Sequence, residues 1–161
     1  MAKARTLDRP MRAYRIGDPD GLFPIWDAGG ALRRAGRWHE AGTPVIYASE
    51  HYATAMLEKL VHHRGVLPPR QHFVELTVPA GVPYEVITPD TCPGWHERDQ
   101  AAARAAGRDW LKCGEACLLI VPSVVARMER NLVVNAAHPD FARIEVGLET
   151  PIWWDERLFE A

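Results

Sequence analysis

Residues 44–61 read PVIYASEHYATAMLEKLV and hold the pattern that decides the fold. The segment Pro44–Ala48 is apolar and rich in β-branched residues, which predicts a buried strand. Ser49 is placed to cap a helix, and Glu50 is favourable in the first turn of that helix. The helix is expected to carry one apolar stripe, because apolar side chains recur at helical spacing: Ala53, Met56, Leu57, Leu60 and Val61.

Glu58 is the polar residue of most interest on this predicted helix. It lies about 100° around the helix from Leu57, so it borders the apolar stripe. A carboxylate at that position can face a cleft instead of the core or bulk water. The alternative is an ordinary ion pair with Lys59, His62 or an arginine.

The rest of the chain alternates irregularly between strand and helix patterns. A loop is expected over 17–30, a short helical turn around 31–35, and a helix over 99–111 that Gly107 weakens. Further strands are predicted over 14–16, 73–78, 84–87, 117–121, 132–135, 143–146 and 152–154. Because there is no regular βαβ alternation, the predicted class is α/β in the α+β sense, with a compact, mixed and largely antiparallel sheet core.

Chain length and composition predict one soluble domain. Residues 1–10 are polar and end in Pro10, so they are expected to form a flexible N-terminal arm, and residues 11–161 a single domain. The 161 residues are 47% hydrophobic and 25% charged, with a net charge of −2. The basic residues are scattered, so no direct nucleic-acid binding is expected and a nuclease is disfavoured.

The cysteines and apolar runs favour the cytoplasm. Cys92, Cys113 and Cys117 contain no CxxC pair, which fits a reducing compartment. The longest apolar run, 116–121, is too short to span a bilayer, so no membrane association is expected. No apolar segment of a signal peptide follows the basic N-terminal residues.

Two arginines are candidate anion ligands. Arg37 follows Gly36 and precedes Trp38, and a guanidinium can grip two phosphate oxygens at once. The alternative for Arg37 is a surface arginine stacked on its neighbouring tryptophan. Arg15 is a second candidate, with a strand-end ion pair as its alternative.

Tyr47 and Glu58 suit the cleavage of a glycosidic bond. The Tyr47 ring can stack on nicotinamide and its hydroxyl can donate to a ribose oxygen; the alternative is a half-buried core tyrosine. When the bond between nicotinamide and ribose breaks, positive charge develops on the ribose carbon. A fixed Glu58 carboxylate would stabilise that charge.

Ser123 follows a proline at the end of an apolar strand. It can bind phosphate or orient a substrate, and it can equally cap a helix over 124–128. A Ser-His-Asp hydrolase is a weak alternative, because no histidine or acid lies at a diagnostic spacing from Ser123. His62-His63 belongs to no zinc motif, and no metal is predicted.

Taken in order, these motifs resemble one family, the RES-domain toxins of bacterial RES–Xre toxin–antitoxin modules. The likeness runs from about residue 12 to 159. The stretches that carry it are YRI at 14–16, GRW at 36–38, VIYAS at 45–49, AMLE at 55–58 with His62, GRDWL at 107–111, VPS at 121–123, 131–135, HPDF at 138–141 and DERL at 155–158.

The resemblance implies a fold like that of ADP-ribosyltransferases and an enzyme that acts on NAD+ as its substrate. By position, the resemblance implies that Glu58, Tyr47 and Arg37 are catalytic residues and that Glu58 is the catalytic carboxylate. Arg15 and Arg37 would hold the NAD+ phosphates, Tyr47 would contact the nicotinamide end, and Ser123 would support ligand placement. Asn135 becomes a structural or second-layer member of the site.

The resemblance also implies partners and leaves the reaction open. The expected partner is an Xre-type antitoxin protein that blocks the pocket, and a homodimer within that complex is left open. Degradation of NAD+ by hydrolysis, or by phosphorolysis with inorganic phosphate as co-substrate, is the main hypothesis. The alternative is transfer of ADP-ribose to a protein. A degenerate, non-enzymatic member would lack Arg37 or Glu58, and both are present.

One departure from the family pattern lies beside the candidate pocket. The family often has Gly-Gly-Arg-Trp-Asn where this chain has Ala35-Gly36-Arg37-Trp38-His39. The histidine is expected to change a hydrogen bond there. The loop between Gly17 and Gly30 contains Phe23, Pro24 and Trp26, to which no role is assigned.

Overall fold

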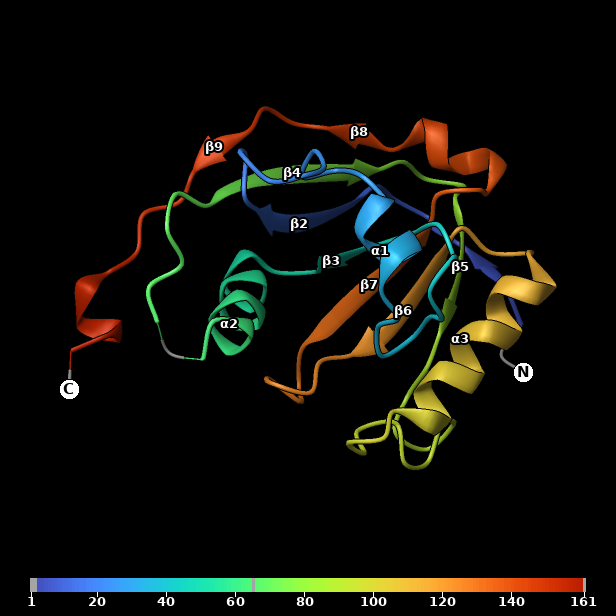
Figure 1. Cartoon of the computed structure of the whole chain (residues 1–161). Helices are drawn as coiled ribbons and strands as arrows, with labels where there is room; N and C mark the ends of the chain where they lie inside the picture. Colours follow the sequence, from blue (N-terminus) through green and yellow to red (C-terminus); the bar gives the residue numbers. More distant parts are fainter. Residues whose placement is uncertain (1–2, 65, 161) are drawn as a thin grey trace.

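The computed structural model describes residues 3–64 and 66–160. Strands and helices alternate irregularly along the chain, as predicted (Figure 1). In order, the elements are β1 (Arg5–Thr6), β2 (Met11–Gly17), α1 (Gly29–Arg33), β3 (Val45–Ser49), α2 (Tyr52–His62), β4 (His72–Val78), β5 (Pro83–Val86), α3 (Ala101–Cys113), β6 (Leu118–Pro122), β7 (Arg130–Asn135), the 3-10 turn η1 (Pro139–Arg143), β8 (Glu145–Val146), β9 (Thr150–Pro151) and η2 (Glu156–Leu158).

The strands join in the order β1-β5-β6-β7-β3-β2-β4-β8, and β9 also pairs with β4. In the described chain the only parallel pair is β5 with β6, and the other pairs are antiparallel. The predicted mixed, largely antiparallel sheet is therefore confirmed.

The sheet splits between β2 and β3. These neighbouring strands share one residue pair, Tyr14 with Ser49. By contrast, β2 pairs with β4 from Met11 to Gly17, and β3 pairs with β7 from Val45 to Ser49. The strands thus form two half-sheets, β2-β4-β8-β9 and β3-β7-β6-β5-β1, which appear as separate layers in Figure 1. Helix α2 lies beside the split.

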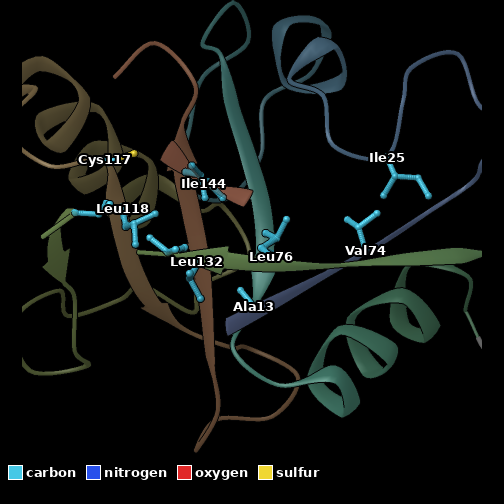
Figure 2. Close-up of a cluster of buried hydrophobic side chains, with 12 residues drawn as sticks. Ala13, Ile25, Val74, Leu76, Cys117, Leu118, Leu132 and Ile144 are labelled. Atoms are coloured by element: carbon cyan, nitrogen blue, oxygen red, sulfur yellow. The ribbon is translucent and has the colours of Figure 1, made fainter. Parts of the chain in front are cut away.

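Two apolar clusters fill the interior. The first joins residues from both half-sheets, as Figure 2 shows: Ala13, Val74 and Leu76 with Leu118 and Leu132. The second lies between α3 and the opposite face of β3, β6 and β7, and its members include Trp38, Val45, Trp95, Trp110, Leu119 and Val133. The alternating side chains of β6 and β7 therefore face a core on both sides.

Gly107 brings α3 close to the segment that carries Arg37. A Cβ at this position would lie 1.7 Å from the carbonyl oxygen of Trp38, closer than any atomic contact permits. The glycine that weakens the helix in isolation is therefore required by packing. It lets Trp38, which is 3% exposed, enter the second cluster while Arg37 beside it stays at the surface of the cleft.

The prediction that the apolar stripe of α2 faces the core is wrong. Ala53, Leu57 and Val61 are exposed, the last two at 43% and 54%. The buried residues of α2 are Thr54 and Ala55. Small residues face inward because the helix packs closely on the split between β2 and β3. Glu58 is one turn from Thr54 and Ala55, so it points inward with them.

The predicted helix cap at Ser49 is also wrong. Ser49 is the last residue of β3 and pairs with Asn131 of β7, so its backbone continues the ladder. His51 occupies the N-cap position and makes no side-chain capping bond. Long-range strand pairing has overridden a local capping signal.

The N-terminal and C-terminal segments differ from expectation as well. In the described part of the predicted arm, Arg5–Thr6 pairs with β5, and Leu7 exchanges backbone hydrogen bonds with Gly81 and Val82; residues 1–2 lie outside the described residues. The strand predicted over 152–154 is not formed, since pairing with β4 ends at Pro151. The strand predicted over 143–146 is limited to β8. Across the described residues no helix has the length and apolarity to cross a membrane.

Candidate active site

A cleft with two lobes opens where β2 and β3 diverge. The smaller lobe has a volume of about 220 Å³ and lies between β2, β3 and α2. The larger lobe, about 550 Å³, extends over Gly36–Trp38 toward the turn after β6. Five residues line both lobes: Arg15, Tyr47, Glu58, His62 and Asn131. Four of the five predicted site residues thus meet in one cleft, since Arg37 lines the larger lobe.

Glu58 is fixed by side chains from distant strands. Its Oε1 accepts a hydrogen bond of 2.8 Å from Ser123 Oγ and one of 2.6 Å from Asn131 Nδ2. Asn131 is oriented in turn, because its Oδ1 accepts a 2.7 Å bond from Ser49 Oγ. Both bonds to the carboxylate converge on one oxygen, and the described side chains place no hydrogen bond on Oε2. Oε2 therefore keeps its capacity to accept hydrogen bonds, and Glu58 lines both lobes of the cleft.

Ser123 lies behind Glu58 instead of lining the cleft. It has no exposed surface, and its hydroxyl accepts a 3.1 Å bond from the Ala126 N–H while it donates to Glu58. The segment 124–128 forms a turn and not the alternative helix considered from the sequence. This position suits a role in orienting the Glu58 carboxylate. Direct contact with phosphate, the role also considered from the sequence, would require Ser123 to line the cleft.

Arg15 reaches across the split in the sheet. Its Nε donates to the Ile25 carbonyl at 2.5 Å and its Nη1 to the Tyr47 carbonyl at 2.7 Å. Burial lowers the pKa of Arg15 to about 10, partly opposed by Asp27. The guanidinium remains charged at neutral pH, and it stands in a place where positive charge is poorly solvated.

Arg37 is held at the mouth of the larger lobe. Its Nη1 donates to the carbonyls of Trp95 at 3.0 Å and Glu97 at 2.9 Å. Trp38 beside it is buried in the second cluster and so does not form the exposed stacking platform considered as an alternative. The backbone of the loop that precedes α3 therefore sets the position of this guanidinium.

Tyr47 presents its ring to both lobes and turns its hydroxyl toward His39. The hydroxyl lies 2.8 Å from His39 Nδ1 and accepts a 3.1 Å bond from the Trp38 N–H. His39 Nε2 lies 2.9 Å from the Arg34 carbonyl. Burial lowers the pKa of His39, which favours the neutral ring. Nε2 must then carry the proton, so Nδ1 accepts from Tyr47.

This arrangement differs from the predicted donation of the Tyr47 hydroxyl to a ribose oxygen. The only hydroxyl proton is directed at His39, and burial raises the pKa of Tyr47 to about 12. The ring remains available for stacking. Gly36 leaves room for the pair, because a Cβ there would lie 2.7 Å from His39 Cε1 and 2.8 Å from the Tyr47 hydroxyl.

Asn131 and Ser49 are site residues that the sequence analysis did not single out. Their signal was present but ambiguous, since Asn131 stood within a family-like stretch and Ser49 was assigned to a helix cap. Asn135, considered for the site, instead pairs with Val45 at the far end of β7 and accepts a 3.0 Å bond from the Ala137 N–H. Within the described chain, no group of three metal-ligating side chains is gathered.

The comparisons with known proteins point to one family. A family model described as RES domain matches residues 12–155. A protein of Sphingobium sp. named Prs ADP-ribosylating toxin is 35% identical over 152 residues, which is 91% of this chain and 90% of the relative. A Pseudomonas putida protein named Toxin Res is 36% identical over 135 residues, 81% of this chain and 90% of the relative.

A solved structure shares the fold. The crystal structure of the M. tuberculosis MbcT-MbcA toxin-antitoxin complex contains a chain that aligns with a TM-score of 0.74 and 16% identity. The alignment covers 91% of this chain and 86% of that chain. At this identity the likeness establishes the architecture alone.

Proposed function

The chain belongs to the RES-domain family, and from that premise we propose that it is the toxin of a toxin–antitoxin pair and degrades NAD+ by cleaving the nicotinamide–ribosyl bond. The observation that supports this most is Glu58, held by Ser123 and Asn131 where the two lobes meet. The relatives of this chain include proteins named as toxins.

In the proposed reaction, the bond between the ribose C1 and the nicotinamide nitrogen breaks first. The electron pair leaves with nicotinamide, which becomes neutral, and positive charge develops on the ribose. Glu58 Oε2 accepts hydrogen bonds from the ribose hydroxyls and stabilises that charge. The oxygen of water, or of inorganic phosphate as co-substrate, then bonds to C1. The products are nicotinamide with ADP-ribose and a proton, or with ADP-ribose phosphate.

The other site residues bind and orient the substrate in this proposal. The Tyr47 ring stacks on the nicotinamide end, and Arg37 with Arg15 holds the phosphates. Arg15 and Arg37 each donate N–H groups to two backbone carbonyls, which fixes the position of the guanidinium. Their remaining N–H groups can donate to an anion. Ser123 acts through Glu58. The partner would be an Xre-type antitoxin in the cytoplasm that blocks this cleft.

The test is the NAD+ concentration over time with purified protein freed of any antitoxin, with and without phosphate. Loss in phosphate-free buffer indicates hydrolysis. Loss that requires phosphate indicates phosphorolysis, with ADP-ribose phosphate as the product. No loss under either condition, from protein with native circular dichroism, would contradict the proposal.

A second function is favoured by one relative. The Sphingobium protein is named for ADP-ribosylation, and it is 35% identical to this chain. In that case the first step is unchanged and a protein side chain takes the place of water. Labelled NAD+ in a cell lysate distinguishes the two, because transfer leaves label on protein while degradation leaves it on small molecules.

A further inference from the structure

The smaller lobe contains a cationic side chain that the proposed mechanism does not use. Lys59 lines this lobe beside Arg15 and Glu58, and it is half-buried. Among the described residues, no carboxylate lies within ion-pair distance of its ammonium group. A half-buried lysine that faces a cavity beside an arginine calls for an explanation.

Burial and charge both disfavour the ammonium form at this position. The pKa of Lys59 is lowered first by burial and then by the charge of Arg15, with Asp18 opposing them. The pKa of Arg15 is lowered by burial as well. Two cations with like charge therefore share a lobe of about 220 Å³ in which solvation is incomplete. A bound anion would stabilise the charged forms of both Lys59 and Arg15.

Arg15 cannot move away from Lys59. Its Nε and Nη1 are committed to the carbonyls of Ile25 and Tyr47. His62, one turn further along α2, lines the same lobe and adds a third group able to donate to an oxyanion. The carboxylate that faces these groups from within the lobe is Glu58, and its Oε1 is already bonded to Ser123 and Asn131.

We propose that Lys59 and Arg15 form an oxyanion subsite in the smaller lobe that takes a phosphate group. Lysine ammonium and arginine guanidinium are the side chains that bind phosphate best. The phosphate comes either from inorganic phosphate or from the diphosphate of the nucleotide. Its role in the reaction rests on the proposed function, whereas the binding itself is measurable without NAD+ cleavage.

The chain offers a direct probe, because its only lysines are Lys3, Lys59 and Lys112. Reductive methylation with ¹³C keeps the positive charge and gives each lysine a separate signal. Titration with inorganic phosphate, and separately with ADP-ribose, should move the Lys59 signal and raise its pKa. Lys112 is exposed at the end of α3 and does not line the cleft, so its signal serves as the control.

Two substitutions sharpen the measurement. Lys59→Met removes the charge at similar length and should weaken binding of the anion by about tenfold, whereas Lys59→Arg and the control Lys112→Met should change it less than about twofold. Weakening for inorganic phosphate alone assigns the subsite to a free phosphate, and weakening for ADP-ribose alone assigns it to the nucleotide diphosphate. Both outcomes support the subsite.

A stationary Lys59 signal with both probes, in the folded wild-type protein, would overturn the inference. That experiment needs no substitution, so a failure of Lys59→Met to fold does not affect it. If the protein cleaves no NAD+ but the Lys59 signal still moves with phosphate, the proposed function fails and the subsite stands.

Discussion

The two sides of the cleft are built in different ways. On one side, Glu58 is held by side chains alone: Ser123 and Asn131 donate to it, and Ser49 orients Asn131. On the other side, Arg15 and Arg37 are held by backbone groups, and Tyr47 by a backbone N–H together with the His39 side chain. The arginines donate to the carbonyls of Ile25, Tyr47, Trp95 and Glu97, and Tyr47 accepts from the Trp38 N–H.

The difference has a consequence for how each side fails. A carboxylate held by side chains can be displaced by a single substitution that leaves the backbone in place. Groups held by backbone are harder to displace, but their loss leaves backbone carbonyls without a donor, which costs folding free energy where those carbonyls are shielded from water. We therefore expect losses of activity on the Glu58 side and losses of stability on the arginine side.

The largest expected effect is on activity, from Glu58→Gln. The substitution removes the negative charge at nearly constant volume, and an amide cannot stabilise the developing positive charge. NAD+ cleavage should fall by about 10²- to 10³-fold or more, measured by NAD+ loss under saturating substrate. The melting temperature should stay close to that of the wild type; an unfolded variant would make Glu58 structural instead.

Arg15→Lys is the strongest test of the arginine side. A lysine keeps the charge but cannot bond to the two carbonyls, of Ile25 and Tyr47, that the guanidinium satisfies together. The free energy of unfolding should fall by about 2 kcal/mol, measured by urea denaturation. Arg12→Lys is the matched control, because Arg12 lies on the same strand and is 72% exposed at the side chain. Equal stability of the two variants would contradict the comparison.

Asn131→Ala should have an intermediate effect, on activity more than on stability. It removes the 2.6 Å bond to Glu58 and leaves Ser123 as the remaining side-chain donor. A loss of one such bond to a charged group corresponds to about tenfold in rate. The drop should appear in kcat with little change in KM, since Asn131 acts through Glu58. A change in KM alone would indicate that Asn131 contacts substrate instead.

The smallest expected effect is a pH dependence of stability from His39. Burial lowers the pKa of His39 in the folded protein, so the unfolded chain takes up the proton first as pH falls below about 6.5. This residue's contribution to stability is complete above that pH and is lost progressively below it. Stability of His39→Asn, compared with the wild type between about pH 5 and 8, should lack this component. Parallel pH profiles would show that His39 does not titrate in this range.

Patterns along the chain predicted most elements, because each is a local property. The strand at 45–49, the helix that carries Glu58, and the strands ending at Pro122 and Asn135 follow apolar periodicity. Apolar periodicity did not predict which face of α2 is buried, since the stripe of larger apolar residues on this helix is exposed. What faces inward on α2 depends on how close the helix lies to β2 and β3, and periodicity carries no information about that distance.

The amino-acid sequence by itself determined which groups are available for chemistry: the guanidinium groups of Arg15 and Arg37, the Tyr47 ring and the Glu58 carboxylate. Only the tertiary structure decided their partners. Ser123 and Glu58 are 65 residues apart, and Asn131 and Glu58 are 73 apart, so no spacing in the sequence joins them. They meet because β7 pairs with β3 and β6 pairs with β7, next to the split in the sheet beside which α2 lies. Hydrogen bonds over such separations exist only once the strands have paired.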